Sequence, residues 1–275
     1  MVSMMMYVFL AVLGAAMGSF SGALVWRIKT KRDFVKSRSE CEKCHHQLGV
    51  LDLVPVFSYL FLGGKCRYCR SRIDISIFLS ELTSAIFFTL SYLWFPLGGV
   101  GVVVRDTILF VLWLIILVCF MILGLYDSKY KLLPNKVLFP VIALTGIYFL
   151  IFNFWATDVN LFNIVSEFAL SLLPITGLYG LLYLIGERTG RHLVGFGDVK
   201  LGVAIAFLLS WEGSFMVLFL ANIVGAIFSL VLIVTKHKKM HSLVPFGPFL
   251  LIATVLVFLL QINLENVMTF MYNTL

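Results

Sequence analysis

Two aspartates stand where carboxylates could perform acid–base chemistry at the edge of a membrane. Asp127 ends a long apolar run and is followed by Lys129 and Lys131, whereas Asp198 completes the sequence Gly195-Phe196-Gly197-Asp198 before another apolar run. A carboxylate at the mouth of a membrane helix costs free energy, so it is a functional-site hypothesis by default. Two neighbouring carboxylates can share one proton, so that one activates a water while the other polarises a carbonyl. The pair therefore predicts an aspartic peptidase embedded in a membrane.

The residues around the two aspartates favour access by a peptide. Pro134 forbids continuation of a helix and biases Leu133 toward an extended backbone, and Asn135 can cap the helix that follows. Gly195 and Gly197 allow unusual backbone angles and close approach of another chain. We therefore expect Asp127 to lie where a helix ends and a loop begins, within reach of water and of a substrate at the level of the lipid.

Composition places the whole chain in a membrane. Of its 275 residues, 61% are hydrophobic and 13% are charged, and the mean hydropathy is +1.02. Soluble domains average about 45–50% apolar and about 25% charged residues. The net charge of +7 falls in loops between apolar runs, a pattern of membrane topology rather than of a nucleic-acid-binding face. We expect contact with membrane lipids and none with nucleic acid.

The apolar runs predict an all-α polytopic membrane protein with about eight transmembrane helices. They cover Met4–Trp26, Ile75–Phe95, Asp106–Tyr126, Lys136–Phe154, Ile164–Ile185, Val199–Ser210, Ser214–Thr235 and Phe249–Ile262. A span needs about 20 apolar residues, so the sixth run can cross only with help from preceding residues or a thinned bilayer. As domains, we expect a first transmembrane helix over 1–26, a polar loop domain over 27–74 and a transmembrane peptidase domain over 75–275.

The basic residues predict the orientation of the chain. Alternate loops, at 27–72, 129–136, 188–200 and 236–239, hold 20 of the 21 lysines and arginines, and the other set of loops holds only Arg105. By the positive-inside rule the basic loops face the cytoplasm. We expect a multi-pass protein of the bacterial cytoplasmic membrane, with both termini outside and both aspartates at the cytoplasmic face.

Four cysteines predict a metal site in the first loop. They form two C-x-x-C pairs, and the 21 residues between the pairs are close to the spacing of a tetrahedral Cys₄ zinc site: Cys41, Cys44, Cys66 and Cys69. A cytoplasmic loop favours metal over disulfides. Such a closed site would be structural. His45 and His46 could substitute as ligands, but solvated positions are the simpler interpretation, and four reduced thiols without metal are the alternative.

Each of the two aspartates, taken singly, also has a purely structural interpretation. Asp127 could pair with Lys129 or Lys131 at the interface, and Asp198 could cap the helix that follows it. Only the two together, on one face of the membrane, favour catalysis.

Three further features have simple structural roles as their favoured interpretation. We interpret Glu81 as a partner for Arg70 or Arg72 rather than as a third polar group of the site. The sequence 245–248, Pro-Phe-Gly-Pro, would shape the start of the last helix. The cluster Lys236–Lys239 would contact anionic lipid.

Taken in order, these motifs resemble the bacterial prepilin peptidases, also called type IV leader peptidases, over nearly the whole chain. The similar segments are Gly18-Ser19-Phe20 with Arg27, the loop Cys41–Cys69, Glu81-Leu82-Thr83, Asp127 with Leu133-Pro134-Asn135, Gly195–Lys200 and Val244–Phe249. A lone G-x-G-D is weak, but six motifs in order are specific. The resemblance implies a GxGD-type peptidase with Asp127 and Asp198 as its catalytic pair.

The resemblance also implies the substrates and a second activity. Members remove the leader of prepilins and pseudopilins on the cytoplasmic side, after a glycine that precedes the hydrophobic helix, and many then methylate the new N-terminus with S-adenosylmethionine. This chain departs from the family pattern at Gly22, usually asparagine, at Ile77, usually tyrosine, and at Phe78, usually proline. These positions lie outside the aspartate motifs and bear on methylation.

Two other classes of protein remain open from the residues alone. In a proton- or cation-coupled transporter the carboxylate pair would bind the ion, although transport sites lie near the bilayer midplane. In a scaffold of a pilus or DNA-uptake system the cysteine loop would be a docking surface and both aspartates would be dispensable. Which aspartate is the base is also open, because the protons belong to the pair.

Overall fold

The computed structural model describes residues 2–33, 39–95, 103–154, 160–190, 194–235 and 245–262. In these ranges the chain is helical, and its only β-structure is two isolated antiparallel bridges in the first loop. It divides into two compact units, one of residues 1–95 with 117–125 and one of residues 96–116 with 126–275. The prediction of an all-α protein is confirmed.

The first unit is built on a close crossing of α1 (Val2–Thr30) and α3 (Ile75–Trp94). Gly14 and Gly18 are one helical turn apart on α1, and a Cβ at either would lie within 2.6 Å of a backbone carbonyl oxygen of α3. Small residues at this spacing let two membrane helices approach at backbone distance. The Ser80 hydroxyl donates a hydrogen bond to the Gly18 carbonyl at 3.3 Å, so polar groups join the two helices as well.

The loop between α1 and α3 contains η1 (Val50–Leu53), α2 (Phe57–Phe61) and two similar turns. In each turn the N–H of the first cysteine donates to a carbonyl five residues later, and its carbonyl accepts from the N–H four residues later. The residues at that fourth position, His45 and Arg70, both have a left-handed backbone with φ of 56° and 58°. The two C-x-x-C motifs therefore have the same local fold.

Glu81 anchors this loop to α3. Its side chain is buried, and its Oε2 accepts a 2.6 Å hydrogen bond from the backbone N–H of Val56, with a further hydrogen bond from the Ser19 side chain. Val56 has a φ of 63°, which is costly for a β-branched residue. The sequence-based interpretation assigned Arg70 or Arg72 as the partner of Glu81, but the carboxylate binds a strained backbone turn instead.

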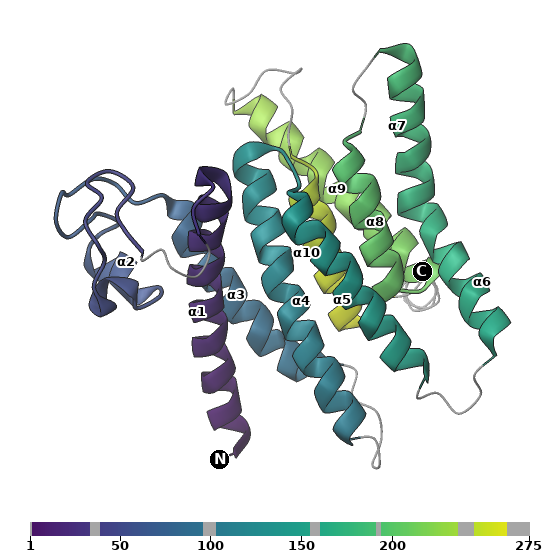
Figure 1. Ribbon diagram of the computed structural model, residues 1–275, viewed down its shortest axis with the longest axis horizontal. Helices are drawn as coiled ribbons and strands as arrows, with labels where there is room; N and C mark the ends of the chain where they lie inside the picture. The colour runs from purple at the N-terminus through teal and green to yellow at the C-terminus, as the bar shows by residue number, and fades with distance from the viewer. Residues whose placement is uncertain are drawn as a thin grey trace. The chain divides into compact units, whose positions relative to one another are not determined.

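The second unit surrounds a short central helix. Its elements are the two ends of α4 (Val103–Tyr130), α5 (Asn135–Phe154), α6 (Leu161–Leu172), η2 (Leu173–Gly177), α7 (Leu178–Thr189), α8 (Phe196–Leu208), α9 (Trp211–Val234) and α10 (Gly247–Leu260). Helix α8 contacts α5, α6, η2, α7, α9 and α10. Figure 1 shows it between α5 and the continuous α6–α7 segment. Residues such as Leu201, Ala204 and Ile205 are fully buried, which explains why α8 is apolar on all sides after Lys200.

A π-helical turn interrupts the fifth apolar run. This turn, η2, follows α6 and contains Pro174, whose missing N–H removes an α-helical hydrogen bond. Gly202 of α8 packs against it, since a Cβ there would lie 2.6 Å from the Thr176 hydroxyl. The run Ile164–Ile185 is therefore one continuous segment with a local widening that receives α8.

All eight expected apolar segments are helical. Six helices are long and apolar enough to cross a membrane, whereas α8 and α10 have 13 and 14 residues. Helix α4 continues beyond its expected end to Tyr130, so Asp127 lies in the last turn of the helix rather than in the loop after it. The expected lipid-binding cluster Lys236–Lys239 lies outside the described residues.

Candidate active site

Asp127 lies in the last turn of α4 with its carboxylate directed into the protein. The residue is buried, and its Oδ2 accepts a 3.1 Å hydrogen bond from the backbone N–H of Gly247. The helix ends at Tyr130, and the left-handed backbone of Lys131 (φ 55°) lets its N–H donate to the Asp127 carbonyl at 2.7 Å. The carboxylate therefore accepts a hydrogen bond from a backbone N–H of another helix. The partners expected for a purely structural role were Lys129 and Lys131.

Gly247 is the first residue of α10, and its lack of a side chain makes this contact possible. A Cβ on Gly247 would lie 2.6 Å from Asp127 Oδ2. Because the first N–H groups of a helix have no partner within the helix, this end is a natural site for an anion. Sequence reasoning assigned Gly247 only a role in shaping the helix start and missed the contact. The available signal was a glycine flanked by Phe246 and Pro248 at the mouth of an apolar helix.

Asp198 lies in the first turn of α8. Its backbone N–H donates to the Gly195 carbonyl at 3.0 Å, which fixes the turn that precedes the helix. Asp198 and Asp127 are 71 residues apart in the sequence, yet their carboxylates interact electrostatically in the folded unit. The structure thus places the two sequence-selected aspartates within electrostatic range of each other.

The sequences around the two aspartates also contact each other. A Cβ on Gly197 would lie 3.0 Å from Leu133 Cβ, so the G-x-G turn packs directly on the loop after α4. Lys200 Nζ donates a 3.1 Å hydrogen bond to Asn135 Oδ1 and lies 4.7 Å from the ring centre of Phe196. Asn135, expected to cap α5, is instead its first residue and bonds to α8. These contacts hold the start of α8 beside the end of α4.

Tyr179 of α7 is a polar group near the pair that sequence reasoning missed. It is buried, interacts electrostatically with Asp198 and contacts the side chain of Asn222 through its hydroxyl. Its ring packs edge-on against Phe246, with 5.8 Å between ring centres. A tyrosine within an apolar run carries no spacing signal, so only the fold reveals its position.

The cysteine cluster lies in the first unit and forms a compact set of sulfurs. The sulfur atoms of Cys41, Cys44, Cys66 and Cys69 all lie within 4.8 Å of one another, and those of Cys41 and Cys69 are 3.8 Å apart. Four thiolates at Zn–S distances of about 2.3 Å in a tetrahedron would be about 3.8 Å apart. The four cysteines could therefore hold a metal ion such as zinc.

The surroundings of the sulfurs suit metal binding. The Ser71 hydroxyl, 3.1 Å from Cys69 Sγ, helps to lower the pKa of that thiol to about 6, and a metal binds the thiolate form. His45 contacts Glu40 at 3.3 Å, and the His46 ring stacks on Tyr68. Both histidines thus have other partners, which leaves the ligand set to the cysteines.

The fold and these two sites define a class: a polytopic helical membrane protein with an interacting aspartate pair and a cysteine cluster in its first loop. Comparison with known families assigns that class more narrowly. Residues 12–95 match the bacterial peptidase A24 N-terminal domain, and residues 108–230 match the type IV leader peptidase family.

Curated relatives agree with this match over most of the chain. A protein of Dichelobacter nodosus is 33% identical over 235 residues, which are 84% of this chain and 74% of the relative. One of Vibrio cholerae is 29% identical over 92% of this chain and 98% of its own length, and one of Bacillus subtilis is 26% identical over 91% and 92%. Each is named prepilin leader peptidase/N-methyltransferase. The chain belongs to the type IV leader peptidase family. No solved structure matches it.

Proposed function

We propose that this protein is an aspartic endopeptidase that removes the leader of prepilins or pseudopilins after a glycine, with Asp127 and Asp198 as its catalytic pair. The observation that carries this proposal is the electrostatic interaction between Asp127, at the end of α4, and Asp198, at the start of α8. Membership of the leader peptidase family and the names of its relatives support the substrate class.

Hydrolysis by the pair follows from two carboxylates that share one proton. The ionised aspartate takes a proton from a water as the water oxygen bonds to the carbonyl carbon of the leader glycine. The protonated aspartate hydrogen-bonds to the carbonyl oxygen and then gives its proton to the leaving amine nitrogen as the C–N bond breaks. The products are a leader carboxylate and a new pilin N-terminus.

The Gly247 N–H orients Asp127 for this chemistry. Because Oδ2 already accepts the hydrogen bond from Gly247, Oδ1 is the atom available to carry or receive the shared proton. A fixed backbone donor also needs no reorganisation during the reaction, which is the advantage of a preorganised polar site. The base and the acid are not assigned to individual aspartates, because the two carboxylates share the titrating protons.

The basic loops favour a cytoplasmic location for this reaction. The turn after Asp127 and the turn before Asp198 both belong to the set of loops that carries 20 of the 21 lysines and arginines. The protein would then lie in the bacterial cytoplasmic membrane and cleave its substrates at the inner face.

A structural zinc ion in the Cys₄ cluster would support the first loop. Four thiolates close the coordination sphere, so the ion would stabilise the two turns and would not take part in hydrolysis. In the described part of the loop the helices are short and no residue of η1 or α2 is buried, so these helices form no core of their own.

A second activity, methylation of the new N-terminus from S-adenosylmethionine, is favoured by the names of the relatives, which join the two activities.

The test is cleavage of a prepilin by purified protein in lipid, comparing the wild type with Asp127→Asn and Asp198→Asn at equal expression. Each substitution removes a group that must gain or lose a proton, so we expect each rate to fall by about 10²–10⁴-fold or more. Glu187→Gln, on the exposed end of α7, removes a carboxylate outside the pair and serves as the control. Undiminished cleavage by either aspartate variant would instead favour the scaffold or the transporter.

A further inference from the structure

The loop between α1 and α3 carries an exposed apolar face, although it lies in the most basic part of the chain. This face is made by side chains of η1 and α2: Val50, Leu51, Leu53, Phe57, Leu60 and Phe61. Phe61 and Val50 are 86% and 85% exposed, so no described residue covers them. Within α2 the exposed residues follow the spacing i, i+3 and i+4, which places them on one side of the helix.

The one charged residue between Val50 and Gly64, Asp52, does not interrupt this face. Its side chain is 5% exposed, and its Oδ1 lies 2.7 Å from Arg67 Nε. Its Oδ2 accepts a 3.1 Å hydrogen bond from the Tyr68 hydroxyl. Because the carboxylate is turned inward and paired with an arginine, η1 presents apolar side chains to its surroundings.

Two contacts fix the depth of α2 along α3. Val56, the N-cap residue of α2, donates its 2.6 Å hydrogen bond to Glu81. The ring of Tyr59 stacks on Phe78, with 5.0 Å between ring centres. Phe78 and Glu81 are four and seven residues after Asp74, the N-cap of α3. At 1.5 Å per residue, these contacts lie about 6 and about 10 Å inside the start of α3.

The length of α3 sets the position of these contacts in the membrane. The helix has 20 residues and is therefore about 30 Å long, the thickness of the hydrocarbon core. A span of this length reaches the interfaces only at its ends, so Asp74 lies at the level of the headgroups. Contacts about 6–10 Å further along α3 lie at the boundary of the acyl chains, the depth at which in-plane amphipathic helices are buried.

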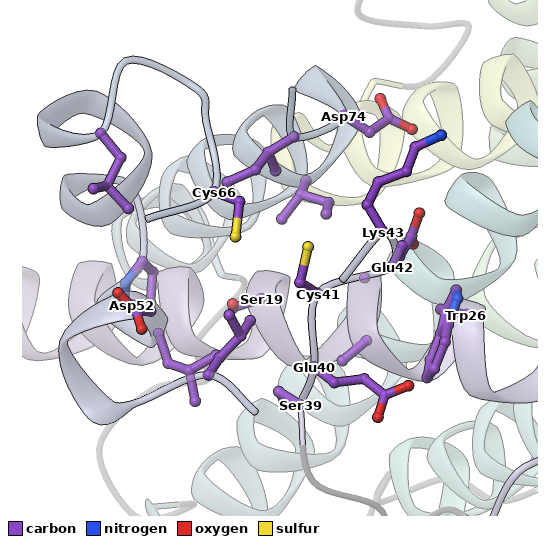
Figure 2. A pocket seen from close by; sticks show the side chains of 18 of the residues that line it. Ser19, Trp26, Ser39, Glu40, Cys41, Glu42, Lys43, Asp52, Cys66 and Asp74 are labelled. Carbon is purple, nitrogen blue, oxygen red and sulfur yellow. The ribbon is translucent and has the colours of Figure 1, made fainter. Parts of the chain in front are cut away.

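The loop also lies along the side of α1. In Figure 1, α2 is beside α1 and not beyond its end. A cavity of about 570 Å³ is lined by α1, the loop and the start of α3, and Figure 2 shows Ser19 of α1 around it together with Asp52 and Cys66 of the loop. Since Ser19 is eleven residues before Thr30, the last residue of α1, the loop packs along the apolar part of the helix.

Basic residues flank the apolar face at the level of the headgroups. Lys65 faces Arg72 in an antiparallel bridge, and Arg72 is two residues before the N-cap of α3. Arg70 is exposed in the same turn. Lys65 and Arg70 form no ion pair with any residue that the structure describes. Cations at this level attract anionic lipids. The apolar face and its basic border thus match the two layers of an anionic leaflet.

We propose that η1 and α2 form an in-plane membrane segment, with their apolar face among the acyl chains of the cytoplasmic leaflet and Lys65, Arg70 and Arg72 at anionic headgroups. Lipid is favoured over a protein partner because Leu79 and Leu82, at the same depth on the membrane-spanning helix α3, are exposed as well. The leaflet follows from the orientation proposed above. The loop expected to be a polar domain would then be partly embedded in lipid.

Photo-crosslinking from single positions tests this contact. The photoreactive amino acid p-benzoylphenylalanine replaces Phe61 in the full-length protein, which is irradiated in nanodiscs of phosphatidylethanolamine and phosphatidylglycerol. Mass spectrometry then measures the share of protein that carries a bound lipid. We expect the same yield as from this label at Val12, an exposed residue within α1. The label at Leu60 is a second variant on the same face, so a folding defect in one variant does not decide the result.

Two controls separate acyl-chain contact from general labelling. The label at Glu42, which is exposed in the first cysteine turn, should give about tenfold less lipid adduct, because it lies outside the acyl chains. Lys65→Gln with Arg70→Gln should remove the enrichment of phosphatidylglycerol among the adducts at residue 61. Arg188→Gln, a matched loss of charge at the exposed end of α7, should keep that enrichment.

Each outcome supports or overturns the proposal. Lipid adducts at residues 60 and 61 that equal those at Val12 support it. Their absence at both positions, with normal labelling at Val12, overturns it. A crosslink from residue 61 to added prepilin that replaces the lipid adduct also overturns it and assigns the face to a protein partner. Unchanged phosphatidylglycerol enrichment in the Lys65→Gln, Arg70→Gln protein overturns the headgroup contacts. The measurements need no cleavage, so failure of the peptidase proposal would leave this inference intact.

Discussion

The Asp127 carboxylate and the Gly247 backbone meet across 120 residues of sequence, with 3.1 Å between Oδ2 and N. This contact joins the first aspartate motif to the start of α10, a segment that carries no ionisable group of its own between residues 245 and 260. The last helix thus takes part in the site through its main chain.

Gly247→Ala should lower the rate of prepilin cleavage by at least tenfold without unfolding the protein. The added methyl group would lie 2.6 Å from Asp127 Oδ2, so the carboxylate must turn away and lose its backbone donor. Gly146→Ala in α5 is the control, since its Cβ would meet the nearest atom at 3.8 Å. Cleavage rates and thermal unfolding of both variants are the measurements. Full activity in Gly247→Ala would mean that the contact does not orient the site.

Lys200→Met and Asn135→Ala should each reduce cleavage severalfold, and the double variant should be little worse than either single one. Their 3.1 Å hydrogen bond holds α8 beside α5, and one such bond contributes about 0.5–1.5 kcal/mol. The effects of two substitutions do not add when both residues act through the same contact. A double-mutant cycle on the cleavage rate checks this, and strictly additive losses would contradict the pairing.

Glu81→Ala should loosen the loop around Val56, whereas Glu81→Gln should largely preserve it. The alanine leaves the Val56 N–H without its acceptor, which costs about 1–3 kcal/mol for a buried group. Glutamine keeps an acceptor oxygen at the same place. Hydrogen exchange of residues 53–62 and limited proteolysis report the difference. Equal protection in the two variants would show that the turn is held by other contacts.

Purified protein should contain one zinc ion, and Cys66→Ala should remove it and destabilise the first loop. Cys66 is the buried member of the cluster, and structural zinc contributes directly to the stability of small domains. Cys119→Ala, in α4 and outside the cluster, should keep the metal. Metal analysis with thermal unfolding decides the matter. An unfolding temperature that does not change when the zinc is lost would show that the ion has no structural role.

Much of the fold could be predicted because apolar runs and basic loops follow directly from the cost of placing polar groups in lipid. Helix ends were less predictable, since one turn of polar residues, Ser128–Tyr130, continues α4 beyond its apolar part. The π-turn at Pro174 was not visible either, because a proline signals a break without specifying its form.

In the candidate active site, too, some residues could be predicted from the sequence and others could not. Asp127 and Asp198 were selected by residue type and position, and the fold places them within electrostatic range. Gly247, Tyr179 and the cavity beside α1 were missed because each depends on contacts between distant segments. Glu81 was assigned the wrong partner for the same reason: charge suggested an arginine, whereas burial selected a backbone N–H.

The short length of α8 and α10 has a consequence for which substrates can be cut. At 1.5 Å per residue, these helices of 13 and 14 residues are about 20 Å long, about 10 Å less than the hydrocarbon core of a bilayer. Both carry residues of the proposed site at their N-terminal ends, Asp198 on one and Gly247 on the other. Either the membrane thins around them or one end of each helix lies below the headgroups. A recessed N-terminal end would place Asp198 and Gly247 below the headgroups, an arrangement that favours a substrate whose cleavage point adjoins an apolar helix.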